Sequence, residues 1–103
     1  IPLTEVIEQR GGVTILNNVI DPGNGEKAVL QYTLKESGMV RAHVFTADGD
    51  LVDVIQSGPQ GEGDYTYAWD GTNQAGDNVA RGIYFIRVKG PGFDEYRKVL
   101  VVK

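Results

Sequence analysis

Apolar and polar residues alternate along most of this sequence, and that period of two constrains the fold more than any other feature. In the run 28–35, Ala28, Leu30, Tyr32 and Leu34 share one side of an extended chain, and polar residues share the other. Successive side chains of a strand point to opposite faces, so such a run has a core side and a wetter side. The pattern returns in later runs, which predicts a protein built of strands.

The alternation predicts about seven strands, separated by turn signals rich in Gly, Asp, Asn and Pro. The expected strands cover about 13–20, 28–35, 39–47, 50–56, 64–70, 82–90 and 95–102. Strands at this spacing, with no helices to make parallel crossovers, predict an all-β fold, an antiparallel sandwich of the immunoglobulin or fibronectin III type. The last strand is apolar on both faces near its end, so we expect it to be central in its sheet.

The N-terminal stretch lacks this alternation. Leu3, Val6 and Ile7 could form one short helical face, and the stretch could equally be a linker or a leading strand. We therefore expect a linker or leading segment at 1–12 and one sandwich domain at 13–103, a size that suits a single small core. The chain begins without an initiator Met or a signal peptide, which we interpret as a mature product or a piece of a longer protein.

Charge and composition exclude several classes of partner. The formal net charge is −4, and the basic residues form no run longer than Arg97-Lys98. Binding to nucleic acid requires a basic stripe that releases counterions from phosphate, so we expect no nucleic-acid partner. No apolar run approaches the roughly 20 residues of a membrane span. The absence of cysteine excludes disulfides and thiolate metal sites.

The loop after the single tryptophan is the sharpest candidate for a binding site. Asp70, Asn73 and Asp77 place oxygen ligands at short spacing, as a calcium site requires. Their spacing does not match the calcium-loop pattern, and no glutamate closes the loop. Asp, Asn and Gly also dominate turns, because their side chains satisfy local backbone groups. We favour a turn and no cofactor, with calcium at these three residues as the alternative.

Three aromatic residues share one face of an expected strand. Tyr65, Tyr67 and Trp69 could stack on a sugar, or they could pack inward. We expect Trp69 in the core, because one large ring fills the gap between two sheets, and we leave Tyr65 and Tyr67 open. Tyr84, near the start of a late strand after Gly82, fits a tyrosine corner, which is a structural device.

The sequence offers no coherent catalytic site, and we expect a non-catalytic protein. His43 is the only histidine and lies on the outward phase of its strand. Ser37 and Ser57 lie in Gly-flanked turns without a nucleophile-elbow pattern. Asp94 and Glu95 are adjacent on a strand, so their carboxyl groups point apart.

Two long stretches, "AVLQYTLKESGMVRAHVFTADGDLVDVI" and "YTYAWDGTNQAGDNVARGIYFIRV", resemble the immunoglobulin-like domain of the flagellar hook-capping protein FlgD. The residues that carry the resemblance are Tyr32, Thr33, Leu34, Val44, Phe45, Asp48, Gly49, Trp69, Asp70, Gly71, Gly76, Gly82, Ile83 and Tyr84. In this family such residues build turns and core, which implies structural roles for Trp69, Gly71, Gly82 and Tyr84. The ending also resembles the C-terminal sorting domains of type IX secretion cargo, through Gly82, Tyr84, Lys98 and Lys103.

The resemblance implies a non-catalytic, C-terminal module of a larger secreted or cell-surface bacterial protein. Its expected role is spacing, docking or secretion sorting, with neighbouring domains or the secretion and surface machinery as partners. An open strand edge would be a natural route for binding. The alternative is a carbohydrate-binding module that uses Tyr65, Tyr67, Phe45 or Phe93, with calcium in the 70–78 loop.

Overall fold

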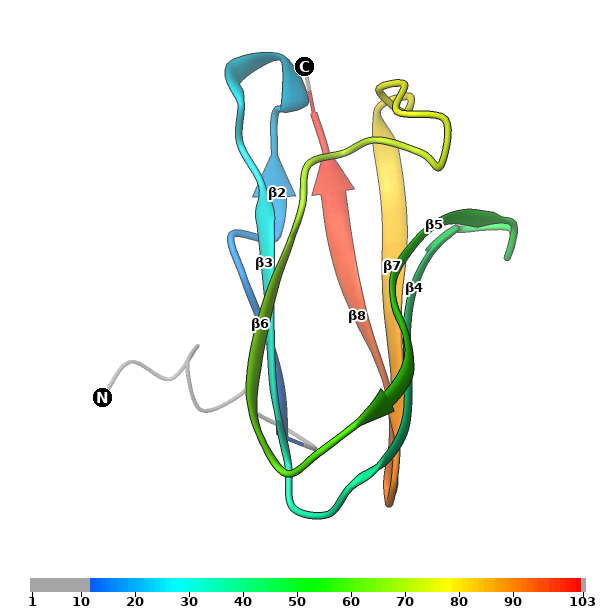
Figure 1. Cartoon of the computed structure of the whole chain (residues 1–103). Coiled ribbons are helices and arrows are strands. Elements are labelled where there is room, and N and C mark those ends of the chain that lie inside the picture. The colour runs from blue at the N-terminus through cyan, green and yellow to red at the C-terminus, as the bar shows by residue number, and fades with distance from the viewer. Residues whose placement is uncertain (1–11, 103) are drawn as a thin grey trace.

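The computed structural model describes residues 12–102, which form two β-sheets packed face to face (Figure 1). The three-stranded sheet has the order β1-β3-β6, and the five-stranded sheet has the order β2-β8-β7-β4-β5. The strands are β1 (Val13–Leu16), β2 (Val19–Ile20), β3 (Ala28–Leu34), β4 (Gly38–Thr46), β5 (Leu51–Gln60), β6 (Gly63–Trp69), β7 (Gly82–Gly90) and β8 (Phe93–Val101). The short 3₁₀ helix η2 (Pro22–Asn24) follows β2.

The expected helical face at Leu3, Val6 and Ile7 lies outside the described residues, as do the rest of 1–11 and Lys103. Among the residues that the structure does describe, no helix is long and apolar enough to cross a membrane.

The core lies between the sheets and is built by the inward phase of each strand. Leu30 and Leu34 of β3 and Ile86 and Val88 of β7 are all buried, and their neighbours along each strand are more exposed. This is the alternation read from the sequence, since side chains one apart on a strand face opposite sides. The radius of gyration of 13.4 Å is close to the roughly 13 Å typical of a 100-residue domain.

The first expected strand, 13–20, is in fact two strands in different sheets. β1 pairs antiparallel with β3, whereas β2 pairs parallel with β8. Asn17 lies between them at a φ of 63°, a left-handed conformation that Asn tolerates better than most residues. The described chain therefore has eight strands rather than seven, and one pair is parallel where only antiparallel pairs were expected.

The last strand, β8, has a paired strand on both sides only near its C-terminal end, whereas a central position was expected. β8 pairs with β7 along its whole length, but with β2 only at Leu100 and Val101. The N–H of Leu100 donates to the carbonyl of Asn18, and the N–H of Val102 donates to that of Ile20, both at 2.8 Å. Further back on β8, Nη2 of Arg97 donates to the carbonyl of Val13 in β1 at 3.0 Å. These contacts join the two sheets along the flank formed by β1, β2 and β8.

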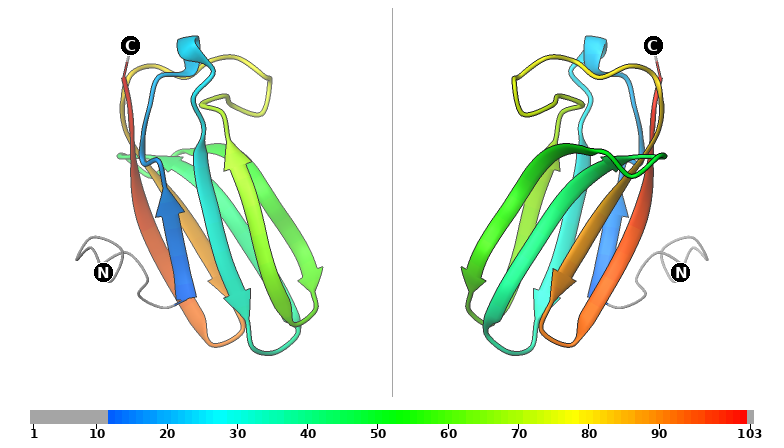
Figure 2. Two further views of the ribbon diagram at one scale, coloured as in Figure 1. Left: turned by 90° about the vertical axis from the view of Figure 1, so that its left-hand side faces the viewer. Right: turned by 90° about the vertical axis from the view of Figure 1, so that its right-hand side faces the viewer.

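β5 and β6 form the opposite flank. Figure 2 shows the two strands together at one side of the sandwich, on the right in its left view and on the left in its right view. β5 runs to Gln60 instead of ending near residue 56, and Pro59 pairs with Met39 of β4. An edge strand tolerates proline because its outer N–H needs no partner in the ladder. Ser57 therefore lies in a strand and not in a turn.

Candidate functional site

The loop between β6 and β7 satisfies its own backbone. Oδ1 of Asn73 accepts hydrogen bonds from the N–H groups of Ala75 and Asp77, both at 3.0 Å. The hydroxyl of Thr72 donates to Oδ1 of Asp70 at 2.5 Å. Two of the three proposed calcium ligands therefore already hold the turn, as Asn and Asp commonly do. Across residues 12–102, no three His, Cys, Asp or Glu side chains gather as a metal site would require.

We expect millimolar calcium to leave the melting temperature of the domain unchanged relative to excess chelator. A site held at 100 times its dissociation constant would add about 2.7 kcal/mol, or roughly 10–20 °C for a domain of this size. Differential scanning fluorimetry of the wild-type chain and of Asp77→Ala measures this directly. A rise of several degrees that Asp77→Ala abolishes, and that Asp48→Ala retains, would establish the calcium alternative instead.

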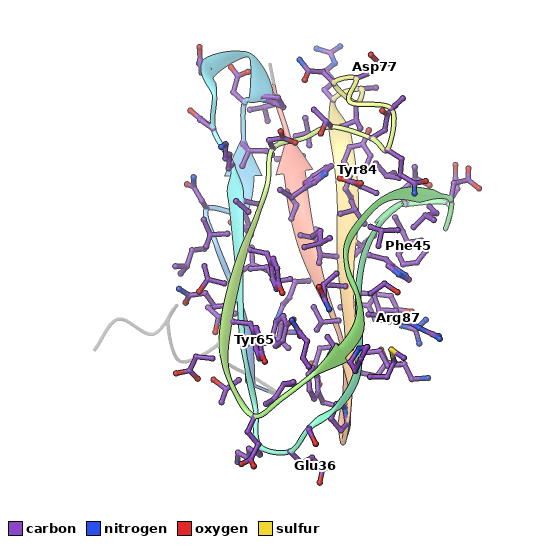
Figure 3. The ribbon with its side chains drawn as sticks, viewed as in Figure 1. Glu36, Phe45, Tyr65, Asp77, Tyr84 and Arg87 are labelled. Atoms are coloured by element: carbon purple, nitrogen blue, oxygen red, sulfur yellow. The ribbon has the colours of Figure 1, made fainter. Side chains whose placement is uncertain are left out.

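The two tyrosines proposed for sugar binding pack between the sheets. Tyr65 and Tyr67 are half-buried, and their rings stack on Tyr32 with centroids 5.4 and 6.1 Å apart. Tyr32 donates to Gln60 of β5, and Gln60 donates through Nε2 to the Tyr67 hydroxyl at 2.7 Å. Burial and the nearby Tyr67 raise the pKa of Tyr32 above its ordinary value. Figure 3 shows Tyr65 on the inner side of β6, where it cannot form a flat outward platform for a sugar.

The other two aromatics of the carbohydrate alternative lie elsewhere. Phe93 packs partly buried against the core at the start of β8, and Phe45 lies on the outer face of β4. The four aromatic residues therefore occupy three separate places in the structure. This placement gives the carbohydrate-binding alternative no common surface.

Trp69 and Tyr84 form a buried pair between the sheets. Trp69 is 2% exposed, and its Nε1–H donates to the carbonyl of Thr72 at 2.9 Å. The Tyr84 ring lies 5.7 Å from the Trp69 ring, and its hydroxyl donates to the carbonyl of Ala80 at 2.6 Å. Burial raises the pKa of Tyr84. Gly71 follows Trp69 in the turn, and Gly82 is the first residue of β7.

A group of apolar side chains lies on part of the outer face of the five-stranded sheet. We call it the aromatic face, and it consists of Phe45, Phe85 and Tyr96, with Val19, Ile83 and Leu100 beside them. Phe45 and Phe85 are directly opposed on β4 and β7, and Ile83 is opposed to Leu100 of β8. Tyr96 is 55% exposed and Ile83 is 46% exposed. A groove of about 420 Å³ runs between the three aromatic rings.

A fixed guanidinium group lies on the aromatic face. Arg87 bonds both carboxylate oxygens of Asp94, at 2.9 Å through Nε and 2.6 Å through Nη2, and its Cζ lies 5.4 Å from the Tyr96 ring centroid. The bonds from Arg87 lower the pKa of Asp94. His43 contacts Phe45 edge-on, with ring centroids 6.0 Å apart. Figure 3 shows Phe45 and Arg87 on the side of the sandwich away from Tyr65.

The outer face of the three-stranded sheet is different in character. Its groove of about 440 Å³ is lined largely by polar side chains, among them Thr14, Gln31, Thr33, Asp64 and Thr66. The two outer faces therefore differ in polarity, and the aromatic face is the candidate for a contact surface. The signal was present in the sequence, since Phe85 and Tyr96 lie on the phase opposite to the core.

Comparison with known proteins gives one family and several structural relatives, two of which follow. The sequence profile described as the FlgD Ig-like domain matches residues 17–92. No curated protein matches the sequence. PorZ of Porphyromonas gingivalis, an essential bacterial surface component of its type-IX secretion system, superposes with a TM-score of 0.63 at 17% identity, over 93% of this chain and 12% of the PorZ chain. FlgD from P. aeruginosa superposes with a TM-score of 0.60 at 22% identity, over 85% of this chain and 69% of that one.

Proposed function

This chain belongs to the FlgD Ig-like domain family, and from that premise we propose that it is a non-catalytic docking module of a larger secreted or surface-attached bacterial protein. A fold does not determine a function, so the function must be argued from the surface of the sandwich. PorZ supports the proposed location at the cell surface, because it is a bacterial surface component of a secretion system.

The aromatic face is the observation that carries the proposal. Apolar surface that leaves water contributes about 25 cal/mol per Å², and aromatic residues and Arg are enriched in protein interfaces. Arg87 adds a guanidinium that Asp94 already holds in place, so less side-chain freedom is lost when a partner binds. The aromatic face suits a partner whose surface is rigid and complementary in shape. A module that only spaced its neighbours apart would not need such a face.

The occupant that we propose is a neighbouring domain of the same parent protein. The matched region makes up 12% of the PorZ chain and 69% of the FlgD chain, so in both relatives this fold is one part of a longer polypeptide. A neighbouring domain is present at high effective concentration, which lets a modest apolar face suffice for docking.

Hydroxyl-radical footprinting tests this proposal. We expect Ile83, Tyr96 and Leu100 to be oxidised several-fold more slowly in the full-length parent protein than in the isolated chain, because the neighbouring domain covers them. Leu16, which is 45% exposed on the other sheet, is the control and should react equally in both. Equal oxidation of Tyr96 in the two proteins would show that the aromatic face is not a docking surface.

A further inference from the structure

The outer edge of β6 has no strand paired with it, since its neighbour on this flank, β5, belongs to the other sheet. In the described chain, β6 pairs with β3 alone, through seven registered positions from Gly63 to Trp69. In immunoglobulin sandwiches of the constant type, one sheet has four strands, and its fourth strand lies at the edge that corresponds to the free side of β6. Here the chain passes from β5 to β6 through Gly61 and Glu62 alone, so no strand of the described chain occupies that place.

The other sheet edges of the described chain are protected. β5 is interrupted by two register shifts against β4 and contains Pro59, and β2 has only two residues. β1 has four residues, and Arg97 already bonds the carbonyl of Val13. Proline, irregular pairing and short length are the devices that keep strand edges from pairing with other chains. β6 has none of these devices, since its pairing with β3 is regular throughout.

The charged residues of the sequence segment that contains β6 are all acidic. No Lys or Arg occurs between Arg41 and Arg81, a stretch that contains both β5 and β6. The acidic residues in this stretch are Asp48, Asp50, Asp53, Glu62, Asp64, Asp70 and Asp77. Glu62 and Asp64 flank the first residue of β6 and Asp70 directly follows its end, so a basic strand that approaches this edge is attracted and an acidic one is repelled.

We propose that the β6 edge binds an extended segment of a partner protein in which Lys or Arg alternates with apolar residues. The segment pairs with the free backbone groups of β6 as an added strand. Because side chains of a strand alternate, one set lies beside Asp64 and Thr66 on the outer face. The other set lies beside the half-buried rings of Tyr65 and Tyr67. This inference goes beyond the docking role of the aromatic face, since it concerns another surface and another class of partner.

The probe that tests it is a synthetic peptide of alternating Lys and Val, matched in length to β6. We expect saturable binding to the isolated chain, with amide shifts and slowed exchange in β6 followed by NMR. Two further peptides of the same sequence, each N-methylated at alternate residues on one of the two edges, keep the charge but lose the backbone donors of that edge. We expect one of the two methylated forms to bind at least about tenfold more weakly, because strand pairing depends on those donors.

Two matched variants separate strand pairing from general attraction. Thr66→Lys adds a charge on the β6 edge, and Gln31→Lys adds the same charge at its partner position on the central strand β3. We expect Thr66→Lys to weaken peptide binding about tenfold and Gln31→Lys much less, with melting curves to verify that both are folded. Equal weakening by the two variants, equal binding of all the peptides, or shifts confined to β5 would overturn the inference. All of these readouts use the isolated chain, so they are independent of the footprinting of the aromatic face.

Discussion

Replacing Trp69 with alanine is expected to lower the free energy of unfolding by about 3–5 kcal/mol. Trp69 is 2% exposed and packs against Tyr84, so its removal leaves a cavity between the sheets. The substitution also leaves the carbonyl of Thr72 without the indole N–H that it accepts. The total stability of such a domain is about 5–15 kcal/mol, so this one change removes a large share of it.

Urea denaturation followed by far-UV circular dichroism measures the loss, because the substitution removes the only tryptophan and with it the fluorescence signal. Tyr96→Ala is the matched control, since it truncates another large aromatic that is 55% exposed. We expect that variant to lose less than about 1 kcal/mol, the usual range for surface substitutions. Comparable losses in the two variants would contradict the central place of Trp69 in the core.

The second large effect is expected for Gly71→Ala, which should lose about 2–4 kcal/mol from two separate causes. Gly71 has a φ of +79°, a conformation that residues with a side chain rarely adopt. An added Cβ would also lie 2.5 Å from Cγ of Pro22 in η2, which is far inside van der Waals contact. Either the turn or η2 must move to relieve the contact.

Gly76→Ala in the same loop separates the two causes. Gly76 has a φ of +86°, but an added Cβ would meet no atom within 4 Å. We expect this variant to lose only about 1 kcal/mol, the cost of a left-handed conformation alone. The difference between the two variants, measured by urea denaturation, is the contribution of the contact with Pro22. Equal losses would mean that η2 shifts freely and that the contact contributes nothing.

The alternation of apolar residues predicted most of the strands, but it could not show where the chain changes sheets. Val13 and Ile15 are buried in β1, and Ile20 is buried in β2, so the inward phase changes between them. A strand that crosses from one sheet to the other keeps facing the same core, and its composition stays apolar throughout. Only the phase change at Asn17 and Asn18 signals the crossing, and it is easily taken for irregularity within one strand.

The position at which β5 ends could not be predicted from the sequence, for a different reason. Gly58 and Pro59 are strong turn formers, so the sequence predicts a turn between the expected strands 50–56 and 64–70. The outer side of an edge strand needs no ladder hydrogen bonds, so β5 accommodates both residues and continues to Gln60. Local preference for a turn is weaker here than the pairing of β5 with β4, which the sequence of β5 alone does not reveal.

The candidate site was harder to predict than the fold. The alternation places Phe45 and Phe85 on the outward sides of their strands, and polar residues are the rule on an outward side. Ile86 and Val88 lie on the inward side. Whether outward aromatic residues form one surface depends on register, and only the pairing of Phe45 with Phe85 and of Arg87 with Tyr96 brings them together. Register is set by contacts between distant segments, which a single strand's sequence does not contain.

The parallel pairing of β2 with β8 has a mechanical consequence. These strands lie near the two ends of the described chain and run in the same direction, so tension between the ends slides one strand along the other. The bonds from Leu100 to Asn18 and from Val102 to Ile20 lie across that sliding direction and are stretched together, whereas a hairpin opens one bond at a time. A module tethered at both ends is thereby braced against pulling at the strand pair that joins its second strand to its last.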